Sequence, residues 1–141
     1  MNPIAKAVLA ILPVSKTAGA TASGTIDTKG FSFCSVDLVG SATGDTTAPT
    51  VLKIEQSHDL TTYAAMGVTQ TTDFTLPVGN TAGGVILKAN IDLRGKRRYL
   101  KVTISPGTTT IVAAVANLFK GGNNPAPVGT TGANVDVLVG V

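Results

Sequence analysis

Charged and aromatic side chains are scarce in this sequence. Charged residues make up 13% of the chain and aromatic residues 4%, with no tryptophan. The charged fraction is about half that of an ordinary soluble domain. A surface with few charges loses little hydration energy when another protein covers it, which favours protein partners. The shortage of aromatic rings argues against nucleic acid, because single strands bind to stacking platforms and broad basic surfaces.

Cysteine is nearly absent, and long apolar runs are missing. The single cysteine, Cys34, excludes an internal disulfide and a cysteine-based metal cage, so stability has to come from packing or oligomerisation. No apolar run approaches the ~20 residues that cross a bilayer, so we expect no membrane span. Residues 6–12 imitate a secretory signal, but Pro13 and Lys16 follow the apolar run too closely, and we expect no signal peptide.

Small polar residues replace the missing charges, and they favour strands. The 141 residues include 21 threonines and 16 glycines, with a modest net charge of +3. Threonine's branched Cβ suits a strand better than a helix interior. Alternate side chains are apolar in residues 85–93 and again in 99–104, and this period of two predicts two half-buried strands. We expect them to form a hairpin with Gly95 at its tip, and a polar residue at Leu87 or Ile91 to unfold the sheet.

Weaker patterns predict further strands. Residues 31–39 are apolar on both faces, as in a central strand, and residues 52–55 alternate. Residues 135–141 alternate strictly, which predicts a tail pinned into a sheet of this chain or of a neighbour. Residues 111–119 contain alanines that suit a helix, but their β-branched residues favour a strand. Residues 4–12 form a strand that Pro13 confines to an edge or ends.

The expected fold is a single all-β domain. Stretches rich in Gly, Pro, Asn and Thr predict loops at residues 40–50, 77–84, 105–108 and 121–132. Seven to nine short strands without a helix indicate a β-sandwich, either a jelly roll or another Greek key. Residues 1–16 are expected to form an N-terminal arm or edge strand, residues 17–122 the core, and residues 123–141 a loop and the C-terminal strand.

Five short stretches resemble a known family. They are residues 8–11 (VLAI), 26–31 (IDTKGF), 52–57 (LKIEQS), 91–100 (IDLRGKRRYL) and 133–137 (ANVDV). The chain resembles the decoration, or cement, proteins of tailed-bacteriophage heads. The resemblance implies a jelly-roll virion protein on the outer surface of the head. Such a protein clamps subunits of the major capsid protein, often as a homotrimer, and has no enzymatic activity. No binding residue is carried over from the family.

A basic cluster is the candidate docking site. Arg94, Lys96, Arg97 and Arg98 hold four of the chain's eleven cations within five residues. Three interpretations stay open: a solvated tip or pairing with Asp92, docking on an acidic protein surface, and, least favoured, nucleic acid. Repulsion between solvated charges about 7 Å apart is only roughly 0.6 kcal/mol per pair, so the cluster can exist without a partner.

No catalytic, metal or cofactor motif stands out. A dyad of Cys34 and His58 is conceivable, but a thiol among apolar strand residues is usually inert. One His and one Cys cannot begin a zinc site without distant carboxylates, and the scattered acids leave only a loop calcium open. Gly95-Lys96 lacks the rest of a phosphate loop. Besides the cement protein, we therefore keep one alternative, a β-sandwich that binds carbohydrate or a host surface. A third hypothesis, a hydrolase, finds no credible set of catalytic groups in this sequence.

Overall fold

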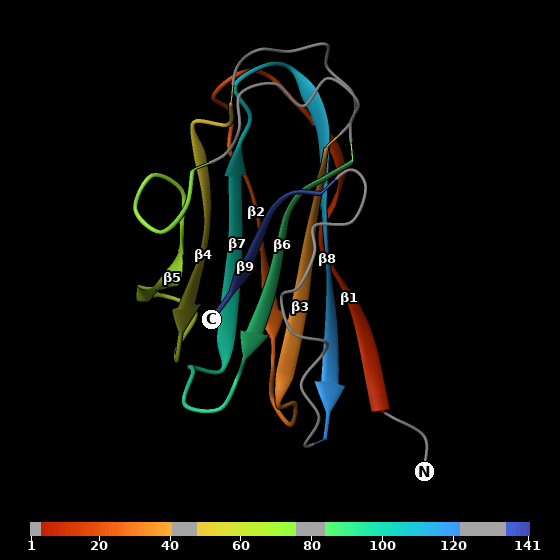
Figure 1. The fold of residues 1–141 in the computed structure, drawn as a ribbon, viewed down its shortest axis with the longest axis vertical. Coiled ribbons are helices and arrows are strands. Elements are labelled where there is room, and N and C mark those ends of the chain that lie inside the picture. Colours follow the sequence, from red (N-terminus) through yellow and green to blue (C-terminus); the bar gives the residue numbers. More distant parts are fainter. Residues whose placement is uncertain (1–3, 41–47, 76–83, 122–134) are drawn as a thin grey trace.

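The computed structural model describes residues 4–40, 48–75, 84–121 and 135–141. Within these ranges the chain forms nine strands and no helix (Figure 1). The strands are β1 (Ile4–Lys16), β2 (Ala22–Asp27), β3 (Phe33–Gly40), β4 (Val51–Ser57), β5 (Tyr63–Thr69), β6 (Gly84–Asp92), β7 (Tyr99–Ser105), β8 (Thr110–Lys120) and β9 (Val135–Gly140). They build two packed sheets, so the predicted all-β sandwich is confirmed.

The strand order is that of a jelly roll. One sheet has the order β1-β8-β3-β6-β9 and the other the order β2-β7-β4-β5. Pairs such as β1 with β8 and β2 with β7 are antiparallel and join strands far apart in the sequence. Without β9, each sheet has four strands, and two Greek keys connect them. β9 is an addition at the edge of the first sheet, where it runs parallel to β6.

The core lies between the two sheets because each strand turns alternate side chains inward. β6 and β7 contribute six side chains that are at most 1% exposed: Leu87, Ala89, Ile91, Leu100, Val102 and Ile104. β3 contributes Cys34, Val36 and Leu38 to the same cluster. These inward faces match the alternation of the sequence.

The expected hairpin of residues 85–93 and 99–104 is wrong. The two segments form β6 and β7, but β6 pairs with β3 and β9, whereas β7 pairs with β2 and β4. Residues 93–98 therefore cross from one sheet to the other, and Gly95 has the expected positive φ, at 81°. Two strands whose apolar faces meet across a core show the same alternation as two neighbours in one sheet.

The other predicted strands are confirmed. Residues 31–39 contain β3, which is central between β8 and β6. Residues 111–119 lie in the strand β8, and residues 52–55 lie in β4. The C-terminal run forms β9 in a sheet of its own chain. Of the predicted loops, only the one at residues 105–108 is largely described, and it connects β7 to β8; most of the other three lies outside the described residues.

β1 is an edge strand, as Pro13 predicts, but Pro13 does not end it. The strand continues to Lys16, and its pairing with β8 shifts register on either side of Ile11. Pro13 lies in the second irregularity, where a missing N–H disrupts no regular ladder. β1 also approaches β2 in the other sheet, because a Cβ on Gly24 would overlap the carbonyl group of Ala10. Only glycine fits where these two edges close the sandwich.

Candidate protein-docking surfaces

The β6–β7 connection carries the four predicted docking residues, Arg94, Lys96, Arg97 and Arg98. It lies at the lower end of the sandwich in Figure 1, with the β2–β3 turn. The backbone N–H of Thr28 in that turn donates to the carbonyl of Arg98 at 3.0 Å. The backbone N–H of Arg97 donates to Oε1 of Gln56 in β4 at 2.9 Å. We call the surface formed by residues 28–32, 57–62 and 93–98 the basic end.

The charge of Arg94 is neutralised by Asp92, the last residue of β6. Its Nη2 lies 2.6 Å from Oδ2 of Asp92, and its guanidinium lies 5.3 Å from the centre of the Phe33 ring. The hydrogen bonds from the Arg94 side chain and backbone lower the pKa of Asp92 from 3.8 to about 2. The pairing with Asp92 that the sequence left open therefore exists, and it applies to this one arginine.

Arg98 is neutralised by a residue that is distant in the sequence. Its Nε and Nη2 donate to the two carboxylate oxygens of Asp27 at 2.9 and 2.7 Å. The side-chain hydrogen bond from Arg98 is the largest cause of the lowered pKa of Asp27, which is about 2. The guanidinium also lies 4.7 Å from the centre of the Tyr99 ring. This bidentate geometry fixes the direction of Arg98 along the sandwich end.

Lys96 and Arg97 are half-buried, and they differ from the two paired arginines of the cluster. Within the described ranges neither side chain makes a hydrogen bond or an ion pair, and the same holds for Lys29 in the β2–β3 turn. The exposed Lys29 follows Thr28, whose N–H donates to the carbonyl of Arg98, so the fold adds a cation that the cluster did not include. Among the described residues, the four predicted ones thus divide into two paired arginines and two cations without an ion pair, Lys96 and Arg97, to which the fold adds Lys29.

A second surface lies on the outer face of β1 and β8. Three large apolar side chains are exposed there: Leu9 (47%), Leu12 (69%) and Ile111 (51%). Leu9 is opposite Val115, whose chain neighbours Ala114 and Ala116 point into the core, so this face is the one turned away from the core. We call these three residues the outer strip. The apolar run of residues 7–12 was its only sequence signal, and a strand buried on both faces gives the same signal.

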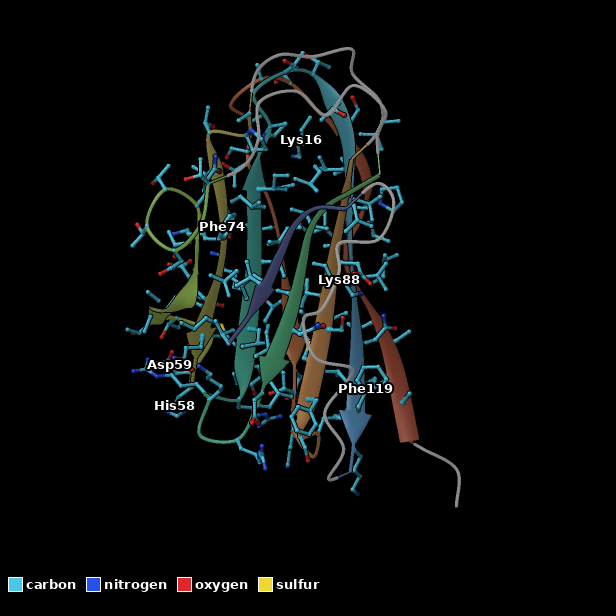
Figure 2. All side chains as sticks on the ribbon, in the orientation of Figure 1. Lys16, His58, Asp59, Phe74, Lys88 and Phe119 are labelled. Atoms are coloured by element: carbon cyan, nitrogen blue, oxygen red, sulfur yellow. The ribbon has the colours of Figure 1, made fainter. Side chains whose placement is uncertain are left out.

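Cys34 and His58 do not form a reactive pair. Cys34 is fully enclosed in the core, where burial raises the pKa of its thiol to about 12. His58 is exposed in the loop after β4 (Figure 2). In the described part of the chain, no three His, Cys, Asp or Glu side chains gather as metal ligands would. The same part contains no helix long and apolar enough to span a membrane.

Three of the chain's six aromatic rings offer little open surface to a sugar. Phe33 is buried, Arg98 covers a face of Tyr99, and the ammonium of Lys101 lies 4.8 Å from the centre of the Tyr63 ring. Carbohydrate-binding sites of β-sandwiches usually present an open aromatic face. These three rings are occupied by this chain's own cations or by its core.

The fold and these surfaces define a jelly-roll β-sandwich with two exposed areas suited to protein contacts. No known protein family, curated protein or solved structure matches the chain at a significant level.

Proposed function

We propose that this chain is a structural virion protein that decorates the outer surface of a tailed-phage head and stabilises it by bridging subunits of the major capsid protein. The observation that carries the proposal is that one charge-poor sandwich has two separate exposed areas, the outer strip and the basic end, that are candidates for contacts. The outer strip lies on β1 and β8, and the basic end lies on the loops at one end of the sandwich. A bridging protein needs at least two such surfaces, whereas a simple ligand-binding module needs one.

The two surfaces have different chemistry and suit different contacts. The free charges of Lys29, Lys96 and Arg97 favour an acidic surface on the shell, because opposite charges steer and orient docking. The outer strip is apolar, so copies of it can bury one another, which favours a homo-oligomer: a dimer where two strips face each other, or the expected trimer where three strips meet on a threefold axis. An oligomer holds several basic ends near the shell, so weak individual contacts combine into strong attachment.

Heads that lack the protein provide the test. Adding the purified protein is expected to raise the temperature at which the heads release their genome, and added salt is expected to weaken attachment. Arg97→Ser should weaken binding to the heads and reduce its salt dependence. Lys16→Ser removes the same charge at the opposite end of the sandwich (Figure 2) and should leave binding unchanged.

Two results would count against the proposal. Heads that release their genome at the same temperature with and without bound protein would exclude a cement function. Equal binding of the wild type, Arg97→Ser and Lys16→Ser would remove the basic end from the docking surface. A glycan array tests the alternative, since specific sugar binding without any effect on heads would favour a carbohydrate- or host-binding module.

A further inference from the structure

The loop between β4 and β5 holds a leucine in an unfavourable backbone conformation. Leu60 has a φ of 65°, in the left-handed region that glycine, asparagine and aspartate accept more readily. Its side chain is 46% exposed, in the otherwise polar stretch of residues 57–62. Neither burial nor local conformational preference therefore explains a large apolar residue at this position.

The loop is held in place by its own hydrogen bonds. The backbone N–H groups of Asp59 and Leu60 donate to the buried Ser57 Oγ at 3.2 and 3.0 Å. One carboxylate oxygen of Asp59 accepts the N–H groups of Thr61 and Thr62 at 2.9 and 2.8 Å. These backbone donors hold the pKa of Asp59 well below its usual range. Leu60 is thus presented in a fixed position, which reduces the entropy lost when a partner binds it.

This loop belongs to the basic end. Ser57, where the loop begins, is opposite Tyr99 in the β4–β7 pairing. Gln56, one residue earlier, accepts the backbone N–H of Arg97. His58 and Asp59 lie beside the lower end of β4 in Figure 2, near the β6–β7 connection. Leu60, an exposed apolar side chain, therefore lies at the same end of the sandwich as Lys96 and Arg97.

We propose that Leu60 is the apolar anchor of the docking surface and inserts into an apolar pocket of a protein partner whose rim carries carboxylates. The proposal rests on the proposed function, which makes that partner the phage shell. The charges support this partner, because Asp27, Asp59 and Asp92 are all engaged within the chain while Lys29, Lys96 and Arg97 remain free. An apolar anchor with a charged rim is the usual composition of a protein interface.

The test uses a substitution that relieves the backbone strain at residue 60 and at the same time removes the apolar side chain. Leu60→Asn is expected to leave the melting temperature unchanged or raise it, because asparagine tolerates a positive φ. The same variant is expected to bind heads that lack this protein at least about tenfold more weakly than the wild type does. Losses of this size are usual when an interface anchor is removed. Thr71→Asn is the matched control. Thr71 has a φ of 69° and is exposed in the turn after β5, so relief of strain there should not change binding.

Leu60→Met and Leu60→Gly complete the set. Leu60→Met keeps an apolar side chain and should retain binding, while Leu60→Gly supplies a second folded variant without the anchor. If the wild type binds heads and the folded Leu60→Asn and Leu60→Gly proteins bind equally well, the anchor is excluded and the proposed function stands. If the wild type itself does not bind heads, both proposals fail.

Discussion

Replacing Leu87 by alanine removes a side chain that is fully buried in the centre of β6. Truncation of a buried leucine usually destabilises a domain by about 2 to 5 kcal/mol, because the lost transfer energy is increased by the cavity that remains. In a domain of this size about 3 kcal/mol corresponds to a drop of roughly 10 °C in melting temperature. Leu12→Ala removes the same atoms from a side chain that is 69% exposed. Its effect on folding should be within about 0.5 kcal/mol.

Urea unfolding followed by circular dichroism measures both variants. It should be run at two protein concentrations, since self-association adds to the apparent stability of the wild type. Sedimentation of the same samples is expected to show that Leu12→Ala weakens oligomerisation while Leu87→Ala does not. Equal loss of unfolding free energy in the two variants would refute the assignment of inner and outer faces. An unchanged oligomer in Leu12→Ala would remove the outer strip from the self-association surface.

Two further predictions concern single groups. Cys34 is expected to resist thiol reagents at pH 8 in the folded protein and to react only after unfolding, because it is enclosed and its thiol pKa is raised to about 12; labelling followed by mass spectrometry checks this, and rapid labelling of the native protein would contradict it. Asp27 and Asp92 have pKa values lowered from 3.8 to about 2, so their contribution to stability is present above pH 4 and is lost as the pH falls towards 2. The urea concentration at the midpoint of unfolding should fall with decreasing pH in the wild type. It should fall less steeply in the double variant Arg94→Ser, Arg98→Ser, which lacks both ion pairs.

The alternation of apolar side chains predicted most strands and their inward faces, but not their partners. β6 and β7 show this most clearly, because their correct faces were compatible with a hairpin that does not exist. β2 was not predicted as a strand, since Ala22 and Ile26 are its only buried apolar residues and Gly24 interrupts the pattern. The need for glycine at that position comes from the Ala10 carbonyl in the other sheet, a contact that a local pattern cannot reveal.

The candidate site was predictable only as far as it is local in the sequence. The run of residues 94–98 identified the basic cluster, and Asp92 was close enough to be considered as a partner. The ion pair of Arg98 with Asp27 spans 71 positions and depends on the pairing of β2 with β7. The free Lys29 and the exposed Leu60 reach the same surface only through the jelly-roll connections. Composition favours a protein partner, and the fold brings Lys29 and Leu60 to the surface that is proposed for it.

The edges of the sheets bear on how copies of this chain can associate. An exposed edge strand invites pairing with another chain, and unlimited pairing of this kind produces fibres. The edge of β1 is covered at Ala10, where the strand approaches Gly24. Beyond Ala10, the regular edge is interrupted by the register shifts on either side of Ile11 and by Pro13. The outer strip lies on the face of β1 and β8 beside this protected edge. Association through the strip would therefore join faces and not edges, which permits a closed oligomer of defined size, as a protein that decorates a shell of fixed symmetry requires.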